Sequence, residues 1–227
     1  MQKIVFFSLL LFSLATNASG VAKFTGIDGG KPYSLSLEYL DRATSRIDIE
    51  DSSDINNYFL FKNKQVQVVT TYLGNTLVMD MASMSQLAEK FGVMDVLGID
   101  SNTLLVNVID MAPTGKKETV AGIVGDVYTV TWSRNNVKQT DELVASGDRR
   151  AWEYTAAWID AMNVISQATP SITIKGDELM SRINSKKLGI LRFGKRIQLV
   201  SVQDRPVSPS RFESPGTSIT IPGLGNL

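Results

Sequence analysis

The stretch Ser34-Leu35-Ser36-Leu37-Glu38-Tyr39 alternates polar and apolar residues, and this pattern sets the fold class. Successive side chains of a β-strand point to opposite faces of the sheet, so the alternation predicts a strand with one buried face. The same period continues outward over residues 21–81, for example at Ile47 and Ile49, with turn signals such as Lys62-Asn63-Lys64 between the strands. We therefore expect an antiparallel meander with one apolar and one polar face.

The remainder of the chain mixes strands with helices. We expect strands at 104–109, 126–132, 138–145, 189–193 and 197–202, with the last two forming a closing hairpin. Ser83 is expected to cap a short helix over residues 84–91, and Asp177 to cap a single further turn. Asp148 is expected to cap a long helix over residues 149–167, which ends before Pro170.

The long helix carries an apolar stripe at helical spacing. Its members are Trp152, Ala156, Ile159, Met162 and Ile165 or Ser166. Tyr154 and Trp158 lie off the centre of this stripe, where exposed aromatic rings would offer a surface for a partner or ligand. The alternative is that these two rings pack against the sheet.

The first residues have the layout of a secretory signal peptide. Lys3 supplies a positive start, residues 4–14 form an apolar run too short to cross a bilayer, and small residues lead to Ala18-Ser19. We expect cleavage between Ala18 and Ser19 and export to a Gram-negative periplasm, with secretion outside the cell as the alternative. No later apolar run reaches transmembrane length, so we do not expect an integral membrane protein.

Composition narrows the chemistry further. The chain has 227 residues with no cysteine and no histidine, and removing residues 1–18 leaves 22 basic and 23 acidic residues. That balance gives no electrostatic footprint for nucleic acid. The absence of histidine excludes Ser-His-Asp catalysis and the usual zinc sites. We expect a monomeric, non-catalytic protein without cofactor or metal; an enzyme that uses only carboxylates is the remaining catalytic alternative.

The C-terminal segment differs from the rest. Four of the seven prolines are Pro206, Pro209, Pro215 and Pro222, and proline cannot take part in a central strand. We therefore divide the chain into a signal peptide over 1–18, a single domain over 19–205, and a proline-rich edge segment with a flexible tail over 206–227.

Two short stretches resemble a known family. They are Glu118-Thr119-Val120-Ala121-Gly122 followed by Tyr128-Thr129-Val130, and Phe212-Glu213-Ser214-Pro215-Gly216. Together with the signal peptide and the meander, they resemble a bacterial exported family of unknown function that is placed with the periplasmic lipoprotein carrier (LolA) and its outer-membrane receptor (LolB). The resemblance implies an α+β fold: an incomplete, strongly curved antiparallel β-barrel with helices covering the concave face.

This resemblance makes a lipid or a lipoprotein acyl chain the expected partner, held against the concave face. The candidate ligand-binding residues are Leu35, Leu37, Tyr58, Leu77, Met79, Met81, Trp152 and Ile159. An alternative is an envelope interaction or structural protein whose barrel is filled and holds no small ligand.

Two other clusters have functional and structural interpretations. Met79, Met81 and Met84 could supply soft sulfur ligands to copper(I), but adaptable core packing or a flexible wall for a lipid needs the same residues. Acidic residues from Asp48 to Asp54 surround a turn but lack the alternation and glycine of a calcium loop, so we expect a solvated turn.

Overall fold

Eleven strands form one antiparallel sheet in the computed structural model, which describes residues 19–28, 30–50, 56–72, 74–81, 83, 107–134, 137–168 and 177–216. The strands are β1 (Gly20–Asp28), β2 (Lys31–Tyr39), β3 (Ser45–Glu50), β4 (Asn56–Lys62), β5 (Gln65–Tyr72), β6 (Asn75–Asp80), β7 (Asn107–Val120), β8 (Ile123–Arg134), β9 (Val137–Ser146), β10 (Gly189–Phe193) and β11 (Ile197–Gln203). The helices are α2 (Arg149–Ala168), α3 (Asp177–Ser185) and the 3-10 helix η2 (Pro209–Phe212).

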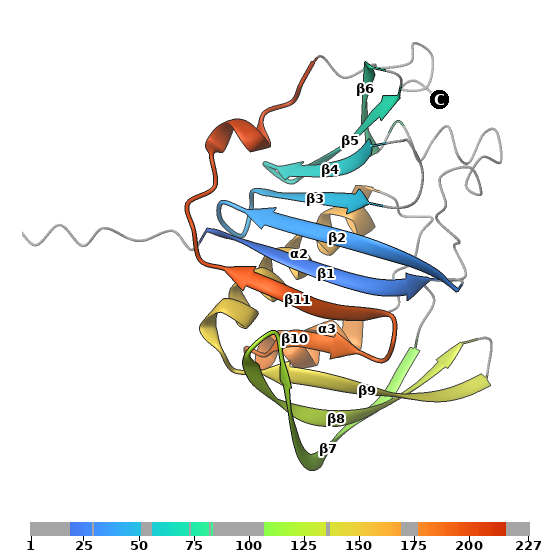
Figure 1. The fold of residues 1–227 in the computed structure, drawn as a ribbon. Helices are drawn as coiled ribbons and strands as arrows, with labels where there is room; N and C mark the ends of the chain where they lie inside the picture. The colour runs from blue at the N-terminus through green and yellow to red at the C-terminus, as the bar shows by residue number, and fades with distance from the viewer. Residues whose placement is uncertain are drawn as a thin grey trace, which may run out of the picture.

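The strand order is β6-β5-β4-β3-β2-β1-β11-β10-β9-β8-β7, as Figure 1 shows. Strand β11 returns to pair with β1, so the first and last strands of the described chain lie side by side in the middle of the sheet. Among the described strands β6 and β7 are not paired with each other, so the sheet is open. The antiparallel α+β class expected from the sequence is confirmed.

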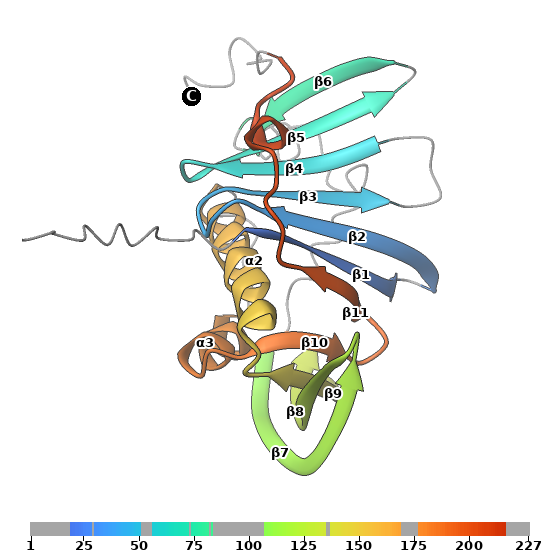
Figure 2. The same ribbon diagram turned by 60° about the vertical axis from the view of Figure 1, so that its left-hand side comes forward.

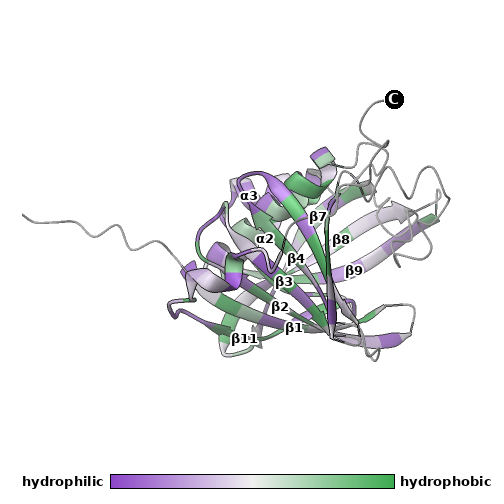
Figure 3. Ribbon diagram, turned by 90° about the horizontal axis from the view of Figure 1, so that it is seen from above, coloured by the Kyte–Doolittle hydropathy of each residue, from purple (hydrophilic) through white to green (hydrophobic). Residues whose placement is uncertain are grey.

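The period-two pattern produces continuous apolar rows across the meander. Backbone pairing places one row of residues on the same face of five neighbouring strands: Leu37, Ile47, Phe59, Val68 and Met79. Figure 3 shows polar and apolar residues alternating along these strands. Because alternate residues point to opposite faces, this register gives the sheet one apolar side for helix packing.

Helix α2 lies on that apolar side. It contacts β1, β2, β5, β10 and β11, and in Figure 2 it runs alongside the sheet from the level of β10 to that of β3. Its cap is the one expected, because the backbone N–H of Arg150 donates to Asp148 Oδ1 at 2.9 Å. Neither α2 nor α3 combines the length and apolar character that a membrane-spanning helix needs.

The start of the helix after β6 differs from the sequence prediction. Met81 and Ser83 are already helical, and Asp80 rather than Ser83 acts as the cap. Asp80 Oδ1 accepts a hydrogen bond from the backbone N–H of Ser83 at 2.8 Å, which is the geometry of an N-cap carboxylate. The predicted helical residues 84–91 lie outside the described part of the chain.

A smaller core lies on the opposite face of the sheet. There Val207 and Phe212 pack with Val21 and Leu60, so the segment after β11 is fastened to the sheet through η2. The proline-rich composition of this segment therefore coexists with a buried aromatic anchor. Residues 217–227, the end of the predicted tail, lie outside the described part, and so do residues 1–18.

Candidate functional site

The residues predicted to line a ligand site do not share one environment. Leu35 and Leu37 are buried in the main core, where Met81 also belongs and Met79 packs at its border. Leu77 lies on the same face but is 36% exposed on the edge strand β6. These five side chains therefore share one face of the sheet, from the centre beneath α2 to the edge.

The structure does not bring Tyr58 together with them. Tyr58 pairs with Asp48 in the register of β3 and β4, which places it on the opposite face from Phe59. The guanidinium of Arg46 lies 3.5 Å from the centre of its ring, and Arg46 in turn binds Asp48. Tyr58 is therefore the partner of an ion pair on the side where η2 packs.

The predicted stripe of α2 is rotated relative to the face that packs on the sheet. The main core takes Ala151, Tyr154, Ala157 and Ala161 from this helix, together with Trp158 at its border. Ile159 packs in a second core with α3 and β7–β9, whereas Trp152 is partly exposed and has the Arg42 guanidinium 5.9 Å from its ring centre. Trp152 and Ile159 therefore do not share a site with Leu35 and Leu37.

The two rings placed off the stripe are the ones that pack inward. Tyr154 is fully buried against Phe24, with ring centroids 5.3 Å apart, and its hydroxyl donates to the Ile190 carbonyl. Burial raises the pKa of Tyr154 well above its ordinary value. Trp158 lies 6.4 Å from Phe24 between centroids. The prediction that Tyr154 is partly exposed is wrong, and for both rings the packing alternative holds.

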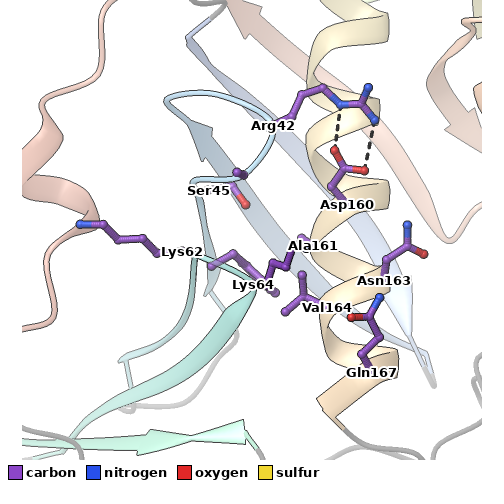
Figure 4. Close-up of a pocket in the computed structure, with 11 residues that line it drawn as sticks. Arg42, Ser45, Lys62, Lys64, Asp160, Ala161, Asn163, Val164 and Gln167 are labelled. Atoms are coloured by element: carbon purple, nitrogen blue, oxygen red, sulfur yellow. Dashed lines mark hydrogen bonds and ion pairs between the residues drawn. The ribbon is translucent and has the colours of Figure 1, made fainter.

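A pocket of about 330 Å³ lies beside the second half of α2. Figure 4 shows that its walls come from the β2–β3 loop, the β4–β5 turn and one face of the helix. Its lining residues are Arg42, Ala43, Ser45, Phe61, Lys62, Lys64, Asp160, Ala161, Asn163, Val164 and Gln167. Such a volume lies at the lower end of the range of small-molecule sites.

The inner wall of this pocket continues into the main core. Phe61 and Ala161 belong to that core, and Val164 packs against it. Ser45 is buried at the same wall. The outer rim is polar, with the amides of Asn163 and Gln167 exposed on the helix. A ligand in this pocket would therefore touch apolar carbon on one side and polar groups on the other.

The rim carries an excess of positive charge. Arg42 Nε donates to Asp160 Oδ2 at 2.8 Å and Arg42 Nη2 donates to Oδ1 at 3.1 Å, so these two charges neutralise each other. Lys62 and Lys64 form no ion pair with a described residue. Lys64 lines the pocket together with Ala161 and Val164, whereas in Figure 4 the side chain of Lys62 points away from α2. Lys64 is thus the cation best placed to meet a ligand.

The backbone of Lys64 is unusual. Asn63 and Lys64 form the two-residue turn between β4 and β5, with φ angles of 53° and 60°. Asparagine tolerates this left-handed region, but lysine adopts it at a cost of about 1–2 kcal/mol. The sequence identified this turn, but it gave no sign that the lysine would face α2, which depends on tertiary packing.

Two kinds of candidate metal ligand occur in the sequence, carboxylates and methionine sulfurs. Among the described residues, no group of three carboxylates could hold an ion. Asp51 and Asp54 of the acidic turn lie outside the described part, as does Met84. Met111 packs in the second core, apart from Met79 and Met81.

In comparisons with known proteins, the chain matches no protein-family model and no curated protein.

Proposed function

We propose that this protein is a non-catalytic, exported carrier that binds an amphiphile, either a lipid or a lipoprotein acyl chain, at the pocket beside α2. In this proposal the leader over residues 1–18 directs the chain to the periplasm. The open sheet acts as a strongly curved half-barrel whose concave face is partly covered by α2. The observation that carries the proposal is the two-sided pocket, whose apolar wall joins the core and whose rim carries Lys64, a lysine with no ion pair to a described residue.

The charge on the rim selects the class of ligand. An anionic head group, carboxylate or phosphate, would sit at Lys64, while the adjoining methylenes would lie against Phe61, Ala161 and Val164. Each methylene removed from water contributes about 0.8 kcal/mol. An exposed ion pair contributes only about 0–1 kcal/mol, so the tail supplies affinity and the head group supplies preference.

The test is a set of twelve-carbon ligands that differ only in the head group: dodecanoate, dodecyl phosphate, dodecanol and dodecyltrimethylammonium. Titration calorimetry should show the two anions binding up to about fivefold more tightly than the alcohol, with the cation weakest. If all four ligands bound with equal affinity, Lys64 would have no role in the choice of head group. If none of the four ligands bound, the proposed carrier function would be refuted.

Two lysines in left-handed turns make a matched pair of variants. Lys187 has φ = 50° after α3, far along the chain from the pocket, and Lys64 has φ = 60° at the pocket. Glycine adopts this region freely, so Lys64→Gly and Lys187→Gly should each preserve or raise the melting temperature. Only Lys64→Gly should weaken binding of dodecanoate. Equal affinity in the two variants would contradict the proposed head-group contact.

An interaction protein with a filled core is the second candidate. It is favoured by the complete burial of Leu37 on the sheet and Ala157 on α2, which both belong to the main core. Asn163→Trp would fill the mouth of the pocket, and Asn184→Trp at an exposed position of α3 is its control. A carrier should lose amphiphile binding only in the first variant; an interaction protein should bind no amphiphile in either.

A further inference from the structure

Four polar side chains meet where the first turn of α2 approaches the ends of β2 and β11. Arg149 is at their centre: its Nη1 donates to Glu153 Oε1 at 2.7 Å and its Nη2 donates to Asp204 Oδ2 at 2.6 Å. Tyr39 is the fourth member and lies at the end of β2. One guanidinium thus faces two carboxylates, which leaves this group of side chains with a net charge of −1.

Two polar atoms in this group are buried without a hydrogen-bond partner among the residues that the structure describes. They are Tyr39 Oη and Glu153 Oε2, and Tyr39 as a whole is only 1% exposed. Burial, followed by the charges of Glu153 and Asp204, raises the pKa of Tyr39 well above its ordinary value, so its hydroxyl stays protonated. A buried polar atom without a hydrogen-bond partner destabilises a fold, so two such atoms in the same group need an explanation.

The start of the described chain lies close to the hydroxyl of Tyr39. Gly20 pairs with Tyr39, and a Cβ on Gly20 would lie 2.7 Å from Tyr39 Oη. Ser19 precedes it and reaches the other side of the cluster, since Ser19 Oγ donates to the Arg205 carbonyl at 3.4 Å. Ser19 and Gly20 thus connect the surroundings of the buried phenol with the segment that carries Asp204, and Ser19 carries the first backbone nitrogen of the described chain.

We propose that Tyr39, Glu153 and Asp204 form the binding site for a primary ammonium, the α-amino group that is created at Ser19 when the leader is cut after Ala18. In the uncut chain the nitrogen of Ser19 is a neutral amide with a single N–H. After cleavage it carries a positive charge and three donors, which matches the net charge of −1 and the unpartnered oxygen of Glu153. This inference rests on the cleavage site and is independent of any ligand in the pocket.

The ammonium would link β1 to α2 through Glu153 and to the end of β11 through Asp204. Only the processed chain can make these links, so the fold becomes more stable after export than before it. A less stable precursor unfolds more readily for passage across the membrane. The leader would thus act on stability as well as on targeting.

The test uses the full-length gene exported from its own leader. Intact mass of the purified protein should correspond to a chain that begins at Ser19. A glycine inserted between Ala18 and Ser19 moves the new ammonium one residue away while it leaves the rest of the chain unchanged. The inserted form should melt about 2–4 °C lower than the natural form.

Substitutions in the proposed site test whether it causes this difference in melting temperature. In Glu153→Gln the natural and inserted forms should melt at the same temperature, and Tyr39→Phe should reduce the difference in the same way if Glu153→Gln folds poorly. Glu178→Gln is the control, because Glu178 pairs with Arg182 on α3 and the difference should persist there. A mature chain that starts elsewhere, equal melting of the two forms, or a difference unchanged in Glu153→Gln would each overturn the proposal.

Discussion

At the scale of single residues, the structure reverses the burial that helical spacing predicts for Trp152 and Trp158. Trp158 packs against the main core and lies 6.4 Å from Phe24 between ring centroids, whereas Trp152 is partly exposed beside Arg42. Trp158→Ala should lower the free energy of unfolding by about 2–4 kcal/mol, because it opens a cavity at the helix–sheet contact. Trp152→Ala should lower it by about 1 kcal/mol or less.

Urea denaturation of the two variants checks this order. The stripe drawn from the sequence predicts the reverse, a large loss at Trp152 and almost none at Trp158. A greater loss of stability in Trp152→Ala would therefore show that the packing of α2 described above is wrong.

The spacing of apolar residues alone could not show which side of α2 packs against the sheet. The face that touches the sheet is built from Ala151, Ala157 and Ala161 with Tyr154, and small residues carry little weight in a search for large apolar side chains. Tyr154 can be buried because its hydroxyl has the Ile190 carbonyl as acceptor, which is a tertiary contact. The spacing of the large apolar side chains therefore indicated a neighbouring side of the helix as the buried one.

At the scale of elements, Gly189 controls how closely α2 approaches β10. A Cβ at this position would lie 2.1 Å from the carbonyl carbon of Ala151, a backbone atom that cannot move without the helix. Gly189→Ala should therefore destabilise the fold by about 3 kcal/mol or more, by forcing the two backbones apart. Gly147→Ala is the control, since nothing lies within 4 Å of a Cβ there.

Chemical denaturation of these two alanine variants separates crowding from the general effect of replacing glycine. The control should change stability by less than about 0.5 kcal/mol. Similar stabilities for both variants would mean that α2 does not sit against β10 as closely as described.

The strands were far more predictable than the contacts between elements. Alternation located β2, β3 and β5 because a half-buried antiparallel strand has a period of two in any tertiary context. The register shifts in β7, between Val108 and Asp110 and between Pro113 and Lys117, leave no such mark. The pocket was missed for a related reason: Lys64 and Asn163 are distant in sequence and meet only through the packing of α2.

At the scale of the whole molecule, the pairing of β11 with β1 joins the two halves of the sheet. The main core takes residues from both halves, including Phe24 and Leu37 from the first and Val127 and Leu191 from the second. Neither half completes this core alone. We therefore interpret the described strands as one cooperative unit, in which a change to the ion pairs of one half alters the stability of the whole.

Acid should destabilise this molecule by protonating carboxylates that arginines hold in the charged form. Arg192 on β10 donates to Glu118 on β7 at 2.7 Å and to Glu142 on β9 at 3.0 Å. The hydrogen bond from Arg192 keeps the pKa of Glu118 below its ordinary value, and the hydrogen bond from Arg150 does the same for Asp148. A lowered folded-state pKa contributes stability above the unfolded-state pKa, and this contribution is lost as the pH falls through the folded-state value.

The free energy of unfolding should therefore stay nearly constant from pH 7 to pH 6, where the chain has no histidine to titrate, and fall below about pH 4.5. Glu118→Gln should be less stable than the natural protein at pH 7 by about 0.5–1 kcal/mol, because the pair with Arg192 is partly exposed. That difference should shrink toward zero near pH 2, where Glu118 is protonated in both states. Exposed Glu213, which forms no ion pair with a described residue, supplies the control Glu213→Gln. Thermal denaturation across this pH range measures both variants, and a difference for Glu118→Gln that stays constant down to pH 2 would show that its charge does not stabilise the sheet.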